Sequence, residues 1–180
     1  MDIPVEVVAL MVSRVHAFEG RPQDGPRPDP EPVGRAEIEV HADLGIVGDR
    51  YFGQTVHRNA AVTFVDAASL DQLARDLELP AVPDPLLMRR NIVLRGYPID
   101  ALAAHRTPDG APVPGRRFTL DTGSGPITFQ ANRPANPCGW MDIAVAPGAF
   151  KALRGHGGIR TTPLTSGTLR VGPAALTLLD

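Results

Sequence analysis

The hydrophobic positions of this chain fall into short runs that predict strands. Val5–Val12 is an apolar, largely β-branched run, as in a buried strand, and Arg35–Val40 alternates polar and apolar positions, as in a half-buried one. Similar segments recur along the sequence at Asn59–Val65, Asn91–Leu94, Arg117–Asp121, Pro126–Ala131, Ile159–Leu164, Thr168–Val171 and Ala175–Leu179. The Thr-Gly-Ser-Gly sequence between Arg117–Asp121 and Pro126–Ala131 predicts a hairpin.

Helical periodicity is confined to two segments. Asp66 stands at an N-cap position, and apolar residues repeat on one face of Ala67–Leu79 until Pro80 ends the pattern. Gly148–Arg154 predicts a second, shorter helix that ends at Gly155.

Glycine and proline are frequent in the segments between these elements. They predict loops at Glu19–Gly34 and His105–Gly115, and an irregular segment at Asn132–Asp142. Seven to nine strands, two or three short helices and frequent turns predict a mainly β fold, an antiparallel β-barrel or sandwich. Strands do not alternate with helices, which argues against Rossmann and TIM architectures. A length of 180 residues predicts one domain, residues 1–180, that buries about 70 % of its extended surface.

Composition narrows the classes of function. A net charge of −2 gives no general attraction to nucleic acid or to an anionic membrane. The single cysteine excludes an internal disulfide and a cysteine-rich zinc module. No apolar run is long enough to cross a membrane, and Met1–Val12 lacks the basic residues of a secretory signal. We therefore expect a cytoplasmic protein without nucleic-acid or membrane partners, and the oligomeric state stays open.

The basic residues are all arginine except Lys151. Two alternatives would account for this excess: a biased genome, or the use of guanidinium groups to bind phosphate or carboxylate. The common sequence signatures of enzymes, such as the Walker A loop, GxGxxG, HExxH and GxSxG, are absent. The five histidines are far apart and show no metal-ligand spacing.

Cys138 is the residue on which the functional interpretation depends. It lies in the sequence NPCGW, a setting that is typical of a turn and excludes the middle of a strand. One interpretation is a buried thiol that serves as a small hydrophobic residue. The other is an exposed sulfur, with Arg133 nearby to stabilise a thiolate and with His57 or His156 as a base.

Three polar clusters and one glycine pair are further candidates. Arg89, Arg90 and Asn91 are either solvated at a strand end or form a grip for an anion. Asp49 and Arg50 predict an ion pair that braces a turn, with a ligand contact by Arg50 as the alternative. The segment His57-Arg58-Asn59 carries the same ambiguity. In GHGGIR (Gly155–Arg160), the adjacent glycines allow close approach of a ligand or end a helix.

Taken in order, these pieces resemble the molybdenum-cofactor sulfurase C-terminal domain, the MOSC family. The matching segments span nearly the whole chain and are GIVGDRYFG (Gly45–Gly53), RRNIVLRG (Arg89–Gly96), Pro137-Cys138, GHGGIR (Gly155–Arg160) and SGTLRVG (Ser166–Gly172). The compact RRNIV version resembles the small stand-alone bacterial members. The chain departs from the family at Gly172-Pro173, where members usually have Gly-Asp, and it offers no clearly aligned acid near the metal.

The resemblance implies a β-barrel in which Cys138 binds molybdenum or carries sulfur as a persulfide. It also implies that Arg89 and Asn91 lie near the pterin of the cofactor. Pyridoxal phosphate is associated with the family through the aminotransferase-like half of the full sulfurases, which these 180 residues do not contain. The reductases of the family need electrons, and since the chain has no flavin or iron–sulfur motif, a separate electron-donor protein is implied.

The chemistry of the cofactor agrees with the residues. A molybdopterin ends in a phosphate and has a ring rich in donors and acceptors, so its site needs guanidinium groups, an amide, glycine turns and one soft sulfur ligand. We therefore expect a MOSC-like β-barrel with Cys138 as catalytic residue and metal ligand. The expected cofactor-binding residues are Arg50, His57, Arg58, Arg89, Arg90, Asn91, Arg133, Gly157 and Gly158.

The expected chemistry is reduction of N-hydroxylated small molecules or the handling of cofactor sulfur. Whether the protein is an enzyme stays open, because a non-catalytic molybdenum-cofactor carrier or storage module would use the same site without turnover. A third alternative is a barrel with a structural cysteine and a different ligand.

Overall fold

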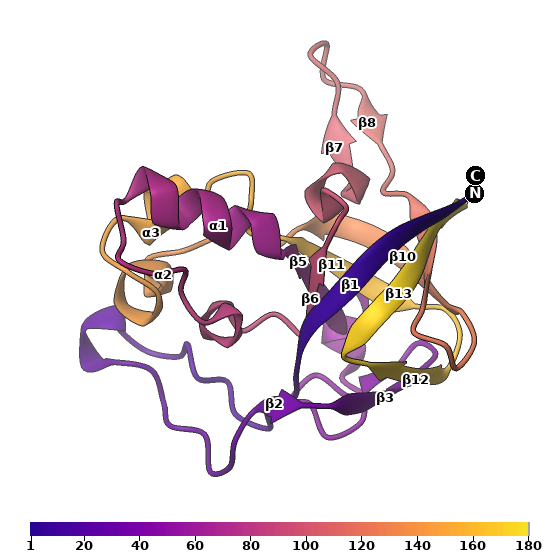
Figure 1. Ribbon diagram of the computed structural model, residues 1–180, viewed down its shortest axis with the longest axis horizontal. Helices are drawn as coiled ribbons and strands as arrows, with labels where there is room; N and C mark the ends of the chain where they lie inside the picture. The colour runs from indigo at the N-terminus through magenta and orange to yellow at the C-terminus, as the bar shows by residue number, and fades with distance from the viewer. Residues whose placement is uncertain (180) are drawn as a thin grey trace.

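The computed structural model describes residues 1–179, and its main feature is a closed β-barrel (Figure 1). Seven strands form the barrel in the order β13-β9-β10-β11-β5-β6-β1, and the pairing of β1 with β13 closes it. Their bounds are β1 Asp2–Met11, β5 Val62–Asp66, β6 Ile92–Arg95, β9 Arg117–Asp121, β10 Ile127–Pro134, β11 Ile159–Pro163 and β13 Gly172–Leu179. The mainly β fold, the barrel and the β9–β10 hairpin predicted from the sequence are therefore confirmed.

The barrel is mixed, which corrects the prediction of a purely antiparallel sheet. β5 and β6 run parallel, with Phe64 opposite Ile92. Parallel neighbours need a crossover of a dozen or more residues, usually with a helix. The chain between these strands supplies it with α1 (Ala67–Asp76) and the 3₁₀-helix η3 (Pro85–Met88). One such crossover is too little alternation of strand and helix to show as a pattern in the sequence.

Helix α1 begins as the sequence predicts. The Asp66 carboxylate accepts a hydrogen bond from the Ala68 backbone N–H at 2.9 Å, which caps the helix. The helix ends three residues before the predicted Leu79, because Glu78 adopts a left-handed conformation (φ 51°) that cannot continue it.

Two short helices, α2 (Trp140–Ala144) and α3 (Ala149–Ala152), join α1 beside the barrel (Figure 1). Strands β5 and β6 are buried on both faces because they lie between the barrel interior and these helices. Phe64 and Ile92 belong to the barrel core, whereas Val65 and Val93 belong to the core under the helices. Such strands read as continuous apolar runs in a sequence.

The barrel interior is filled by side chains that do not reach solvent. Phe64, Phe118 and Phe129 are fully buried, with ring centroids 5.0 to 5.5 Å apart. Edge-to-face and offset contacts of this kind contribute about 0.5–1.5 kcal/mol per pair beyond the burial of the rings. The barrel is therefore a packed core, and any ligand site lies outside it.

Smaller elements surround the barrel and the helices, and the β7–β8 ribbon projects away from the barrel (Figure 1). Of these, the His105–Gly115 segment forms a two-stranded ribbon, which corrects its prediction as a plain loop. The remaining bounds are β2 Gly34–Arg35, β3 Glu37–His41, β4 Gly45–Ile46, β7 His105–Arg106, β8 Pro112–Val113, β12 Gly167–Arg170, η1 Pro22–Asp24, η2 Thr55–Ala60 and η4 Ile99–Leu102.

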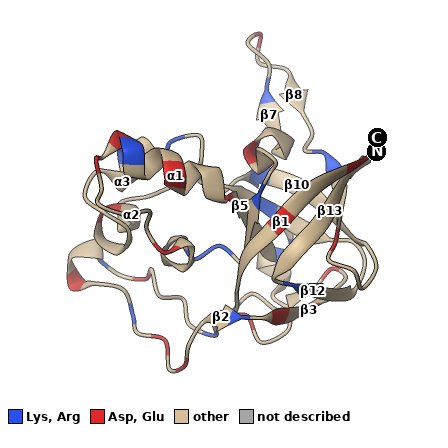
Figure 2. Ribbon diagram, viewed as in Figure 1, with Lys and Arg blue, Asp and Glu red and all other residues tan. Residues whose placement is uncertain are grey.

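The helices are short, and charged residues are distributed over the molecule. Within residues 1–179, none of the helices has both the length and the apolar character to cross a membrane. Acidic and basic residues are spread over the barrel and the helices (Figure 2). Arg89 and Arg90 belong to the short connection between η3 and β6.

Candidate functional site

A cavity of about 180 Å³ lies where the barrel meets the helices. It is lined by four arginines, several aromatic rings and one thiol, and none of its lining residues is an aspartate or glutamate. The lining residues are His16, Ala17, Phe18, Arg50, Tyr51, Arg89, Arg90, Asn136, Pro137, Cys138, Trp140, Met141 and Arg160. A cavity bordered by cations without lining acids favours an anionic ligand.

Cys138 lies at the edge of this cavity and is exposed. β10 ends at Pro134 and α2 begins at Trp140, so the thiol belongs to the short connection between them. The Cys138 carbonyl accepts a hydrogen bond from the Met141 N–H at 2.9 Å, which fixes the backbone of the turn. The interpretation as a buried structural thiol is therefore wrong, and the sulfur is accessible to a ligand.

Arg90 brings a positive charge to the cavity and has no carboxylate partner within residues 1–179. Its guanidinium donates to three backbone carbonyls, of Gly157 at 2.8 Å, Ala135 at 2.9 Å and Met88 at 3.2 Å. Burial, reinforced by the charge of Arg160, lowers the pKa of Arg90 to about 10. Arg90 remains protonated at neutral pH, and an anion in the cavity would favour its charged form.

Arg50 has polar atoms with no hydrogen-bond partner in the described chain. Its Nε and Nη1 are buried and unpaired, and the nearest carboxylate oxygen, Asp49 Oδ2, lies 3.7 Å from Nη1. The ion pair predicted between these neighbours is present, but it is long. An unsatisfied buried donor costs about 1–3 kcal/mol, so a bound acceptor would recover that free energy.

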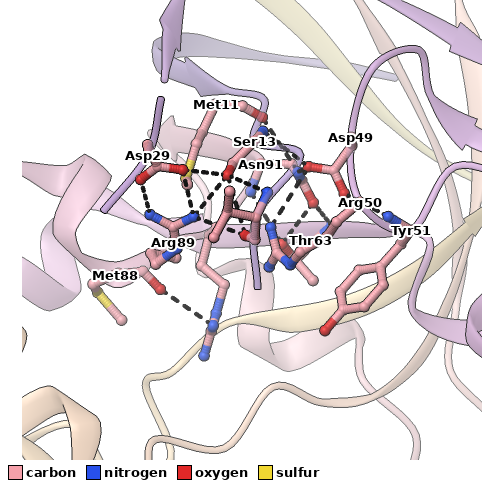
Figure 3. Close-up of polar contacts among 12 residues, drawn as sticks. Met11, Ser13, Asp29, Asp49, Arg50, Tyr51, Thr63, Met88, Arg89 and Asn91 are labelled. Carbon is pink, nitrogen blue, oxygen red and sulfur yellow. Dashed lines mark hydrogen bonds and ion pairs between the residues drawn. The ribbon is translucent and has the colours of Figure 1, made fainter. Parts of the chain in front are cut away.

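Arg89 forms an ion pair with Asp29, which the sequence did not predict. Nη1 donates to Asp29 Oδ2 at 2.7 Å and Nη2 to Asp29 Oδ1 at 3.1 Å, while Nη2 also contacts Ser13 Oγ at 2.9 Å (Figure 3). The side chain is only 10 % exposed, so its interpretation as a solvated strand-end residue is wrong. Arg89 ties the proline-rich loop of Asp29 to the barrel. Its contact with a cofactor stays a prediction.

Asn91 lies beneath the cavity and does not line it. Its Oδ1 accepts from the Thr63 N–H at 3.0 Å and the Thr63 hydroxyl at 2.9 Å, and its Nδ2 donates to Met11 O at 3.2 Å and Asp49 Oδ2 at 3.1 Å (Figure 3). These bonds hold Asp49 in the position from which it faces Arg50. Asn91 therefore organises the wall of the cavity from behind.

The glycine pair of GHGGIR approaches the protein's own backbone. A Cβ on Gly158 would lie 1.9 Å from Phe64 O, and one on Gly157 would lie 2.4 Å from Ala135 O. The space beside these glycines, where the sequence predicted a ligand or a helix end, is filled by the backbone of β5 and of the segment before Cys138. The Gly157 carbonyl also accepts the hydrogen bond from Arg90 Nε.

The remaining predicted residues lie outside the cavity. His57 and Arg133 line a second groove of about 520 Å³. Arg58 pairs with Asp43 on the surface, Nη2 to Oδ1 at 2.6 Å. The structure therefore brings Cys138, Arg50, Arg89 and Arg90 together, supports them with Asn91 and Gly157, and separates His57, Arg58 and Arg133 from them.

Sequence reasoning missed several residues of the cavity. Arg160 is the last residue of GHGGIR and Tyr51 lies within GIVGDRYFG, so both belong to motifs that carry the family resemblance. Phe18 and Trp140 stack with ring centroids 5.3 Å apart, although 122 positions separate them in the chain. No local pattern predicts such a pair.

The fold is a closed, mixed seven-stranded β-barrel with helices beside it, and solved structures share it. The YuaD protein from Bacillus subtilis superimposes with a TM-score of 0.69 and 13 % identity, covering 100 % of this chain and 99 % of that one. YiiM from Geobacillus stearothermophilus gives 0.60 and 16 %, covering 98 % and 75 %, and YiiM from Escherichia coli gives 0.55 and 15 %, covering 100 % and 70 %.

At these identities the likeness shows the fold alone, and that fold is consistent with the MOSC-like barrel expected from the motifs. The sequence matches no protein-family model, and no curated protein sequence matches it.

Loss of the Arg89–Asp29 pair is expected to destabilise the protein at neutral pH, and to matter progressively less as the pH falls below the usual pKa of an aspartate. Removing one partner of a largely buried pair costs about 3 kcal/mol, so Arg89→Ala should lower the free energy of unfolding by that order. The hydrogen bond from Arg89 holds the pKa of Asp29 below its usual 3.8. The stabilisation is therefore complete above pH 3.8 and is lost as the pH falls through the lower pKa of the folded state.

Urea unfolding at pH 7 and pH 3 checks this expectation for Arg89→Ala and for Asp29→Asn. The control is Arg170→Ala, which breaks the exposed pair with Glu37 and should cost less than about 1 kcal/mol. Equal effects for Arg89→Ala and Arg170→Ala would show that the Arg89 pair contributes no more than an ordinary surface contact.

Proposed function

We propose that the chain binds a molybdenum cofactor at the cavity beside Cys138, with the cysteine sulfur as the protein ligand of the metal. The observation that carries the proposal is the combination of an exposed thiol with two lining arginines, Arg90 and Arg160, that form no ion pair with a carboxylate of residues 1–179. Thiolate is a soft ligand that suits a transition metal, and guanidinium groups suit the phosphate and the polar ring edges of a pterin.

The residues present fit such a group. Arg50 offers two buried donors without partners, and Arg90 offers a cation whose hydrogen bonds all go to neutral carbonyls. No cluster of three His, Cys, Asp or Glu side chains suited to a metal ion occurs in residues 1–179. In the proposal, the protein supplies one ligand, the sulfur of Cys138. A cofactor that brings its own further ligands matches this arrangement.

The size of the site is also informative. About 180 Å³ is below the range of roughly 300–1,000 Å³ that is usual for pockets enclosing a whole ligand. The groove of about 520 Å³ that holds His57 offers further room. It adjoins the cavity through the Tyr51 and His57 rings, whose centroids are 4.4 Å apart. A ligand larger than the cavity would extend into this groove.

Bound at this site, the cofactor would supply the two-electron redox chemistry of molybdenum, with N-hydroxylated small molecules as the proposed substrates. The chain itself would contribute the sulfur of Cys138, the positive charges of Arg50 and Arg90, and the aromatic wall of Phe18 and Trp140 that excludes water from one side. Electrons would come from a separate donor protein. Handling of cofactor sulfur by the exposed Cys138 fits the same site.

The experiment that tests cofactor binding is metal analysis with pterin fluorescence on purified protein. We expect about one molybdenum and one oxidised-pterin signal per chain when the host makes the cofactor, and neither when the host cannot make it. Well-folded protein from the first host that contains neither, and that cannot be loaded afterwards, would exclude the proposal. Turnover of a hydroxylamine with a chemical reductant then separates an enzyme from a carrier or storage module.

A further inference from the structure

A β-bulge lies between the cavity and the neighbouring groove. In the pairing of β10 with β11, Ala131 lies opposite Thr161 and Pro134 opposite Ile159. The register shift between them leaves Asn132 and Arg133 on one strand to face Arg160 on the other. Bulges of this kind redirect side chains and are frequent beside functional sites. The bulge thus sets Arg133 across from Arg160 in the strand pairing, with Arg160 lining the cavity and Arg133 the groove.

The two positive charges have no partner in the described part of the chain. Neither guanidinium forms an ion pair with a carboxylate of residues 1–179, and no lining residue of either hollow is acidic. Burial and then the charge of Arg133 lower the pKa of Arg160. Like charges opposite each other on paired strands are destabilising, so this pair weakens the free protein.

Two side-chain amides of the groove are already engaged within the fold. The Asn132 amide donates to Asn59 O at 2.9 Å and Thr162 Oγ1 at 3.0 Å, and the Gln130 amide donates to Gly115 O and Ala131 O at 2.8 Å. These donors are engaged within the fold. The guanidinium of Arg133 forms no hydrogen bond or ion pair within residues 1–179 and is free to meet a ligand, and Arg160 lies across from it on β11.

We propose that Arg133 and Arg160 form an oxyanion subsite at the bulge, which takes a phosphate or carboxylate group of a ligand spanning the cavity and the groove. An oxyanion between the two guanidinium groups converts their repulsion into two charge-assisted contacts. The subsite follows from the charges and the register alone. Only the identity of the natural ligand rests on the proposed function: the oxyanion is the phosphate of the cofactor or a carboxylate of the substrate.

Inorganic phosphate is the probe for the subsite, used on cofactor-free protein at constant ionic strength in a calorimetric titration. We expect the wild-type protein to bind phosphate, and Arg133→Gln to bind it about tenfold more weakly or worse, as the loss of one charge-assisted contact predicts. Without phosphate, Arg133→Gln should melt at the same temperature or higher, because the repulsion with Arg160 is gone. A residue that merely supports the fold would lower the melting temperature instead.

The matched control is Arg154→Gln, which removes the same charge from an exposed arginine outside both hollows. It should leave phosphate affinity unchanged. No phosphate binding by the wild-type protein, or equal affinity of wild-type protein and Arg133→Gln, overturns the subsite. Equal losses in Arg133→Gln and Arg154→Gln also overturn it, because they would mark a general effect of net charge.

Two further measurements identify the source of the oxyanion. If it is the cofactor phosphate, Arg133→Gln purifies with less pterin than the wild-type protein. If it is a substrate carboxylate, pterin content is unchanged and KM rises for a carboxylated hydroxylamine but not for a neutral one. Pterin content and both KM values unchanged would exclude a ligand role for the subsite. Absence of molybdenum in all proteins would refute the proposed function and leave the phosphate titration standing.

Discussion

Cys138→Ser is expected to abolish molybdenum binding and turnover while leaving the fold unchanged. The thiol is exposed and its side chain is not part of the apolar core, so its exchange for a hydroxyl should change the free energy of unfolding by less than about 0.5 kcal/mol. Serine keeps the size of the side chain and loses the soft sulfur donor that molybdenum would need. Metal content, pterin content and melting temperature, measured on the same preparations, check the expectation.

Alkylation gives an independent measurement of the same residue. The exposed thiol of the cofactor-free protein should react readily with iodoacetamide, and loading with cofactor should protect it, since a sulfur bound to a metal is no longer a free nucleophile. Exchange of the surface residue Ser124, as Ser124→Ala, is the control for the handling of a variant protein. Retention of full molybdenum content by Cys138→Ser, or equal alkylation of loaded and cofactor-free protein, would contradict metal ligation by Cys138.

The local pattern of the sequence predicted most strands and the first helix, because their signals are local. The apolar run before Asp66 and the capping carboxylate itself lie within one short segment, and the structure has β5 and α1 there. The parallel pairing of β5 with β6 could not be predicted in the same way. The neighbour of β5 depends on contacts between residues that are distant in the sequence. Phe64 lies opposite Ile92 in the sheet, yet α1 and η3 separate them along the chain.

In the candidate site, the arginines could be identified from the sequence, but their partners could not. Three arginines of similar appearance in the sequence have different partners in the fold: Arg89 binds a carboxylate, Arg90 binds carbonyls and Arg50 keeps unpaired donors. The carboxylate that engages Arg89 belongs to Asp29, 60 positions earlier in the chain. A sequence identifies a guanidinium group, and only the fold shows whether that group is free to bind a ligand.

Gly158→Ala is expected to cause the largest loss of stability among single exchanges near the site. The added Cβ would lie 1.9 Å from the carbonyl oxygen of Phe64, in the middle of the buried strand β5. The residue also has φ +93°, which a side chain disfavours. Backbone atoms of β5 cannot move aside without opening the barrel core, so we expect a loss on the order of 4 kcal/mol or more, measured by urea unfolding.

Gly155→Ala is the matched control, because Gly155 lies in the same loop and has φ +81° with no atom within 4 Å of the added Cβ. It shares the conformational penalty, about 1–2 kcal/mol, and lacks the collision. The difference between the two variants therefore measures the packing of Gly158 against β5. The Asp100 carboxylate accepts a hydrogen bond from the Gly158 N–H at 2.8 Å, and the adjacent Gly157 carbonyl holds Arg90. Gly158→Ala should therefore also displace Arg90 and release the cofactor. Equal free energies of unfolding for Gly158→Ala and Gly155→Ala would contradict the expected loss, because they would show that the loop adapts without disturbing the barrel.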